Sequence, residues 1–340
     1  MKRRTMKYLH YVLLACLSVV VAGTSCPLSG ITPTDQFEVV RAALDAYFGG
    51  DPAGAVTSAA VFEKLNGDDA STTPYVLSVR SAEDFAEGHV PGAKNVPWKT
   101  VANEGALADL PTDETQVVVY CYTGHTGAVA TTVLNAMGYN AVNMKWGIMS
   151  WTQDATVRAS QPFDDATDSN NYATETTANP GSADHHLPTL NVTTSCGTAE
   201  IVRAAAAAYL NGNPAPVIAA QDLSDMINDG DGSTTPFIIS VRSADDYAKG
   251  HIPGAINIPW KTIAQVDNLK MIPPDRDIVV YCYTGHTGAL AATALNMLGY
   301  NAKNLKWGIM SWTQDAAVRG KAPFDDAADS NTYATEAGGG

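Results

Sequence analysis

Two identical cysteine-bearing segments are the most chemically informative feature of the chain. The nonapeptide YCYTGHTGA occurs at residues 120–128 and again at residues 281–289, so Cys121 and Cys282 have the same neighbours. A thiolate is a strong nucleophile, and the glycines that follow it allow successive backbone amides to converge on one point. The pattern predicts a nucleophilic cysteine at the mouth of an amide cradle, present twice in one chain.

The residues after each cysteine are candidate binding groups for an anion or a second sulfur atom. We predict that substrate contacts come from Tyr122, Thr123, Gly124, His125, Thr126 and Gly127, and in the second copy from Tyr283, Thr284, Gly285, His286, Thr287 and Gly288. For the two loop histidines, capping of the loop and contact with substrate both stay open. His185 and His186 lack the three or four ligands of a metal site, so we predict no metal and no other cofactor.

The elements around each cysteine predict an α/β fold. The segments QVVVYCY and DIVVYCY are continuous apolar runs, typical of strands buried in a parallel sheet. After the loop, apolar residues recur at helical spacing up to Gly138 and Gly299. A loop between a strand end and a helix N-terminus receives the positive end of the helix dipole, which favours the thiolate. An earlier helix is expected at residues 35–48, with Asp35 and Glu38 as its capping box.

A long internal repeat predicts two similar domains. WGIMSWTQDATV at residues 146–157 recurs as WGIMSWTQDAAV, and PFDDATDSNNYATE recurs near the C-terminus as PFDDAADSNTYATE. We expect a signal at residues 1–25, a first domain at 31–176, a polar linker at 177–197 and a second domain at 198–336. Each domain is expected to have its own core. The two sites should then act independently, without a disulfide between Cys121 and Cys282.

The N-terminal residues predict export. The basic segment MKRRTMK precedes an apolar run at residues 12–22, which is shorter than the roughly 20 residues of a membrane-spanning helix but typical of a secretory signal. The run leads into AGTSC, so lipidation of Cys26 and plain signal cleavage both stay open. We expect a protein of the periplasm or cell envelope, with or without a lipid anchor. Cys196 can pair with Cys26 only if Cys26 is not lipidated.

The sequence resembles the rhodanese-domain sulfurtransferases. SVRSAEDFAEGHVPGAKNVPW is similar to their strand and turn signature, VVYCYTGHTGAVA to their active-site loop, and MKWGIMSWTQD to their last strand and closing helix. The resemblance covers roughly residues 55–160 and 217–320. It implies two small parallel sheets flanked by helices. It also implies that Cys121 and Cys282 each accept a sulfane sulfur as a persulfide and pass it to a thiophilic acceptor.

The sequence departs from this family at several positions. Ser78 and Ser240 stand where members usually carry Asp. The loop has no Arg or Lys, so only its histidine is a candidate cation there, and use of the dianion thiosulfate is in question. Four lysines that follow strand ends are further candidates near the site: Lys99, Lys145, Lys261 and Lys306.

Three function classes follow from these features. The first is a sulfurtransferase that acts on small sulfur donors and thiophilic acceptors, a protein acceptor included. The second is a carrier that holds sulfur or selenium on cysteine and delivers it to a partner without turnover. A phosphatase of related architecture is disfavoured, because that chemistry uses a loop Arg to clamp phosphate. A net charge of −14 disfavours nucleic-acid partners.

Overall fold

The structure is a computed structural model that describes residues 32–181, 184–212 and 214–338. The predicted signal and the proposed lipidation site at Cys26 lie outside these residues. Within the described ranges, no helix is both long and apolar enough to cross a membrane.

The first repeat alternates strands and helices in the predicted order. Its strands are β1 (Tyr75–Ser78), β2 (Lys94–Asn95), β3 (Val117–Tyr120) and β4 (Ala141–Asn143). Its helices are α1 (Pro33–Gly49), α2 (Ser58–Leu65), α3 (Ala82–Glu87), α4 (His125–Ala136), α5 (Ile148–Trp151) and α6 (Ala155–Arg158), with 3₁₀ turns η1 (Ala70–Thr72) and η2 (Trp98–Thr100).

The second repeat follows the same general order, with one further strand and two further helices among the described residues. Its strands are β5 (Val217–Ile218), β6 (Phe237–Ser240), β7 (Ile256–Asn257), β8 (Asp277–Tyr281) and β9 (Asn301–Leu305). Its helices are α7 (Thr198–Asn211), α8 (Ala220–Asn228), α9 (Ala244–Lys249), α10 (Val266–Leu269), α11 (His286–Met297), α12 (Ile309–Trp312), α13 (Ala316–Arg319) and α14 (Asp326–Asp329), with a 3₁₀ turn η3 (Trp260–Thr262).

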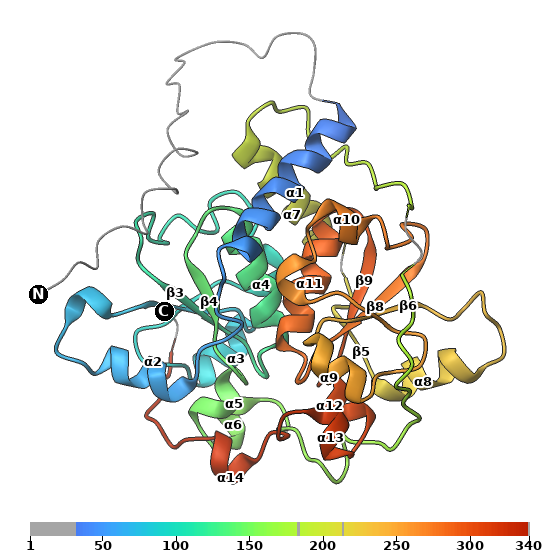
Figure 1. Ribbon diagram of the computed structural model, residues 1–340. Helices are drawn as coiled ribbons and strands as arrows, with labels where there is room; N and C mark the ends of the chain where they lie inside the picture. The colour runs from blue at the N-terminus through green and yellow to red at the C-terminus, as the bar shows by residue number, and fades with distance from the viewer. Residues whose placement is uncertain (1–31, 182–183, 213, 339–340) are drawn as a thin grey trace, which may run out of the picture.

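Both sheets are parallel, so the predicted α/β class is confirmed. The strand orders are β2-β1-β3-β4 and β5-β9-β8-β6-β7. In the first sheet Tyr75 pairs with Val117, and in the second Phe237 pairs with Ile278 at the equivalent position. The cysteine strands β3 and β8 are inner strands, and helices cover both faces (Figure 1). This burial explains why their sequences are continuously apolar.

Helix α1 begins earlier than the sequence pattern predicted. Its N-cap is Thr32, whose Oγ1 accepts the Asp35 amide at 3.2 Å while the Asp35 carboxylate accepts the Thr32 amide at 3.0 Å. The predicted capping box of Asp35 with Glu38 is therefore wrong by one turn. Glu38 instead accepts from Arg41 Nε at 2.8 Å. Pro33 favours the earlier start because the first turn of a helix needs no proline N–H.

The two repeats share a core in addition to the separate core expected in each, since one further buried cluster belongs to the first repeat and another to the second. Helices α4 and α11 lie side by side between the sheets, and α1 and α7 cross over them (Figure 1). One buried apolar cluster runs through both repeats, from Phe37 to Ala302, and Thr132 Oγ1 donates to the Leu290 carbonyl at 3.2 Å. Helices α4 and α11 are buried on nearly every face, so each has a cover on the side away from its own sheet.

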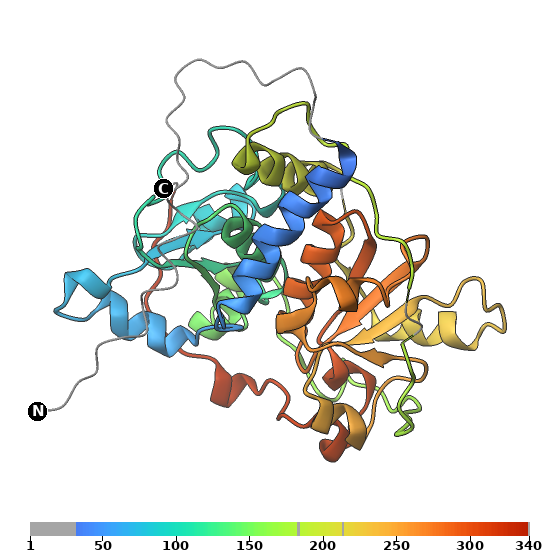
Figure 2. The same ribbon diagram turned by 45° about the horizontal axis from the view of Figure 1, so that its top comes forward.

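The C-terminal tail of each repeat packs on the other repeat. Residues 163–176 run along the second repeat, where the Tyr172 amide donates to the Trp312 carbonyl at 3.1 Å. Residues 324–336 run along the first repeat, where the Tyr333 amide donates to the Trp151 carbonyl at 3.1 Å. The C-terminal segment accordingly lies across the blue and green repeat in both ribbon views (Figure 1, Figure 2). The chain is therefore a pseudo-symmetric pair with exchanged tails.

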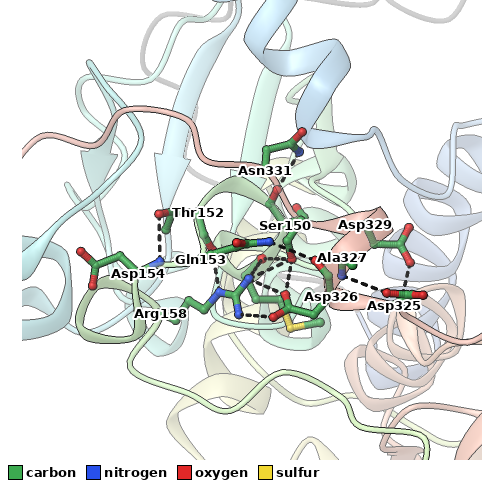
Figure 3. A network of polar contacts seen from close by, with 12 residues as sticks. Ser150, Thr152, Gln153, Asp154, Arg158, Asp325, Asp326, Ala327, Asp329 and Asn331 are labelled. Carbon is green, nitrogen blue, oxygen red and sulfur yellow. Dashed lines mark hydrogen bonds and ion pairs between the residues drawn. The ribbon is translucent and has the colours of Figure 1, made fainter.

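A buried arginine anchors each exchanged tail. Arg158 donates to the carbonyls of Thr152 and Met149 at 2.6 and 2.9 Å, and its guanidinium pairs with Asp326 of the incoming tail at 2.6 Å (Figure 3). Arg319 and Asp165 repeat this arrangement at 2.6 Å in the other half. In each pair the guanidinium lowers the pKa of the carboxyl group below its ordinary value.

Candidate active site

Each loop cysteine lies at the carboxyl end of an inner strand, directly before a helix. Cys121 follows β3 and Cys282 follows β8, and both are free thiols with 1% of their surface exposed. The Gly124 amide donates to Cys121 Sγ at 3.1 Å, and the Gly285 amide donates to Cys282 Sγ at the same distance. The two sulfurs do not form a disulfide with each other in this structure.

Glycine is required at the N-terminus of α4. Gly124 has a φ of +92°, in the left-handed region. A Cβ at this position would also overlap the imidazole of His286, which comes from the other repeat. Gly285 has the equivalent relation to His125. These glycines therefore serve two needs, the turn that aims an amide at sulfur and the close contact between repeats.

Two asparagine side chains support the cysteine loops by hydrogen bonds. Asn143 Nδ2 donates to the Gly124 carbonyl at 3.0 Å, and Asn304 Nδ2 donates to the Gly285 carbonyl at 2.9 Å. Both side chains are fully buried. The sequence interpretation missed them, although an asparagine that recurs at the same place in the two repeats was an available signal. Gly127 and Gly288 pack against these asparagines, whereas the predicted threonines Thr123, Thr126, Thr284 and Thr287 line the cavities described below.

The loop tyrosines turn their hydroxyl groups away from the sulfur. Tyr122 Oη donates to the Asp84 carboxylate and accepts the Ser81 amide at 3.1 Å. Tyr283 donates to Asp246 in the same way at 2.5 Å. Burial, together with the neighbouring carboxylate, raises the pKa of Tyr122. Both tyrosines therefore stay protonated and contribute ring surface to the cavity wall.

The loop histidines join the two repeats. His125 Nε2 accepts the Trp307 amide at 3.2 Å, so the ring proton lies on Nδ1, 2.9 Å from Thr123 Oγ1. His286 accepts the Trp146 amide at the same distance, and the two imidazoles stack with centroids 5.9 Å apart. This geometry favours the capping role, although both rings also border a cavity.

Neither histidine supplies a positive charge to the site. Burial, the adjacent His286 and Lys306 together hold the pKa of His125 well below its ordinary value. Burial and Lys145 lower the pKa of His286 to about 3. The suggestion that a loop histidine is the cation of the site is therefore wrong, because both rings are neutral acceptors in an interface.

Each cysteine opens into a cavity that both repeats build. The Cys121 cavity, of about 430 Å³, is lined from the first repeat by Asp84, Tyr122, Thr123, His125, Thr126, Ala159 and Ser160, and from the second by Pro216, Val217 and Lys306. The Cys282 cavity, of about 790 Å³, receives residues 52–55 and Lys145 from the first repeat. The lysines that follow β4 and β9 thus reach the site of the opposite repeat.

Several further residues contact the protein's own backbone or core and not the cavities. Arg80 is buried and donates to the Val157 carbonyl at 2.7 Å and to the Gly88 carbonyl. Ser78, in the place of the family's Asp, has a buried hydroxyl without a hydrogen-bond partner. Cys196 is disulfide-bonded, while its suggested partner Cys26 lies outside the described residues. In the described part of the chain, no group of His, Cys, Asp and Glu has the arrangement of a metal site.

The family is established by comparison with known proteins. The family model for the Rhodanese-like domain matches residues 58–154 and residues 219–315. These matches cover more than half of the chain, so the chain belongs to the rhodanese-like domain family and has two such domains in tandem. Both matched ranges include the cysteine loop, and both end before the exchanged tails.

Individual relatives are similar to parts of the chain. A sulfurtransferase from Allochromatium vinosum is 33% identical over 78 residues, which is 23% of this chain and 71% of the relative. The HTH-type transcriptional regulator Rv0324 of Mycobacterium tuberculosis is 36% identical over 112 residues, 32% of this chain and 46% of the regulator. This chain therefore spans less than half of the regulator. A solved thiosulfate sulfurtransferase from Pseudomonas aeruginosa is 15% identical with a TM-score of 0.29, over 88% of this chain and 49% of that one.

Proposed function

We propose that the protein is a sulfurtransferase that carries sulfane sulfur as a persulfide on Cys121 and on Cys282. The observation that carries this proposal is the contact of a loop amide with each sulfur, 3.1 Å from Gly124 N and from Gly285 N. A hydrogen bond from an amide stabilises a thiolate, the nucleophilic form of cysteine. The first turns of α4 and α11 add amides without helical acceptors and the positive end of a dipole.

The chemistry proceeds in two displacements at sulfur. The cysteine thiolate attacks the sulfane sulfur of a donor, and a new S–S bond forms while the bond from that sulfur to the donor breaks. The leaving group departs with the electron pair, which for thiosulfate gives sulfite. A thiophilic acceptor, either a small molecule or a protein thiol, then attacks the outer sulfur of the persulfide. The cysteine leaves as thiolate, so the protein returns to its starting state.

The loop supports both displacements without an acid or a base. The negative charge stays on sulfur throughout, so amides and a helix terminus are sufficient to stabilise it. The side chains of Thr123, Thr126 and their counterparts border the cavities and can donate to the donor molecule. Neutral His125 and His286 hold the loops in place.

We also propose that the protein acts in the periplasm or cell envelope. The basic and apolar segments at residues 1–22 support export. The disulfide at Cys196 is of the kind that persists in oxidising compartments. Lipidation of Cys26 and plain cleavage are distinguished by the mass of the mature N-terminal peptide.

Substitution of the two cysteines tests the proposal. We expect Cys121→Ser and Cys282→Ser each to lose part of the thiocyanate formed from thiosulfate or a persulfide donor with cyanide, and the double variant to lose all of it. Circular dichroism controls for folding. One single variant with full activity and the other with none would contradict the two-site proposal. Loading of sulfur on both cysteines without thiocyanate formation would instead identify a carrier.

A further inference from the structure

The two cysteine loops are identical, but their cavities differ in size and charge. The cavity of Cys282 is about 790 Å³ and that of Cys121 about 430 Å³. Since residues 120–128 and 281–289 have the same sequence, the difference arises from the segments that surround them. A donor molecule that enters either cavity contacts these segments.

A lysine from the opposite repeat lines each cavity. Lys145 follows β4 of the first repeat and lines the Cys282 cavity, and Lys306 follows β9 and lines the Cys121 cavity. Each ammonium group lies over the tryptophan that follows it, with Nζ 5.1 and 5.4 Å from the ring centroids. Neither lysine forms an ion pair with any described residue, so each brings a positive charge to the other repeat's site.

The second cavity has a further lysine that the first lacks. Lys321 lines the Cys282 cavity, and its Nζ lies 4.6 Å from the ring centroid of Tyr283, the residue after the cysteine. The equivalent residue in the first repeat is Ser160, which lines the Cys121 cavity. Lys321, too, has no ion pair among the residues described.

The other charges on the two walls leave this difference intact. In the Cys282 cavity Lys261 pairs with Asp51, the buried Arg242 donates to two carbonyls, and the single lining carboxylate is Asp329. In the Cys121 cavity the lining charges are Lys306 and the carboxylate of Asp84. The Cys282 cavity is therefore the more positive of the two.

We propose that the two sites select different sulfur donors, with Cys282 favouring anionic donors through Lys321 and Lys145 and Cys121 selecting little by charge. This inference rests on the proposed sulfur-transfer function of both cysteines. Two ammonium groups in a partly enclosed cavity attract an anion more strongly than one ammonium group in a cavity that a carboxylate also lines. Small anions that carry a sulfane sulfur are the donor class that this wall fits.

The test compares an anionic with a neutral alkylating reagent. Cys121→Ser and Cys282→Ser variants each leave one loop thiol, and the rates of its reaction with iodoacetate and iodoacetamide give a ratio that reports the local charge. We expect the ratio to be about threefold higher or more at Cys282 than at Cys121, and the difference to shrink with added salt. Neither reagent needs sulfur transfer, so this result and the proposed function can fail separately.

Exchange of one residue between the cavities provides the matched controls. Lys321→Ser should lower the ratio at Cys282, and Ser160→Lys should raise it at Cys121. Lys145→Gln should lower the ratio at Cys282 and leave Cys121 unchanged, although Lys145 belongs to the repeat of Cys121. Equal ratios at the two cysteines, or ratios that none of these substitutions shifts in folded protein, would overturn the proposal.

Discussion

A neutral imidazole lies between each cysteine loop and the opposite repeat. His125 and His286 each accept a backbone amide from the partner repeat and are nearly fully buried. Of the two roles that the sequence left open, capping of the loop and contact with substrate, the geometry favours capping, because the ring supports its own loop through a threonine and locks it to the other repeat. The residue pattern predicted the cysteine, its amide cradle and its helix. It did not predict that each histidine accepts a backbone amide of the other repeat, because that contact joins segments far apart in sequence.

The buried histidines make the folded state sensitive to acid. The pKa of His286 falls to about 3 on folding because of burial and Lys145, so only the unfolded chain takes up a proton between its ordinary pKa near 6.5 and that value. The stabilising effect is complete above about pH 6.5 and is lost progressively as the pH falls. We expect His286→Asn to lose stability at pH 7.5 but to reduce the further loss between pH 7.5 and pH 5 by on the order of 1–2 kcal/mol.

Urea unfolding at the two pH values measures this effect. His186→Asn is the control, because His186 is exposed, and it should keep the pH dependence of the unsubstituted protein. An unchanged pH dependence in His286→Asn would contradict a histidine that is held neutral at the interface.

At the scale of elements, the exchanged tails hold each small sheet against its neighbour. The tails lie outside the ranges that match the family model, so the family gives no guide to their path. Their near-identity in sequence was visible at the start, but a repeated segment has the same sequence whether it packs on its own repeat or on the other. The path of each tail depends on which arginine pairs with which aspartate, and the pairs are Arg158 with Asp326 and Arg319 with Asp165.

Removal of a tail anchor should loosen the tail before it unfolds the protein. We expect Arg158→Met to reduce the free energy of unfolding by about 1–3 kcal/mol, because the buried carbonyls of Thr152 and Met149 lose their donor. Residues 324–338 should also become more accessible to protease. Lys94→Gln, at an exposed position of β2, serves as the control of equal charge change. Faster cleavage of residues 163–176 instead would show that the first repeat keeps its own tail.

At the scale of the whole molecule, the chain is a pseudo-symmetric pair with two composite sites. The α/β class and the succession of strand, loop and helix at the cysteine were predictable from continuous apolar runs and helical spacing. The common core was not, because a helix such as α4, which has no Asp, Glu, Lys or Arg, indicates burial without showing which element covers it. Because of that packing, Lys145 and Lys306 each line the cavity of the opposite repeat. A loop without Arg or Lys thus has cations beside it that the loop sequence alone does not reveal.

The most direct test of the central claim is peptide mass spectrometry of the protein after incubation with a sulfane-sulfur donor, under non-reducing conditions. The account predicts that the peptides with Cys121 and Cys282 each gain the mass of one sulfur atom, and that cyanide removes it with formation of thiocyanate. The same gain should be absent from the serine variant of each cysteine. Donor-treated protein in which neither peptide gains sulfur, or in which Cys121 and Cys282 are crosslinked to each other, would contradict it.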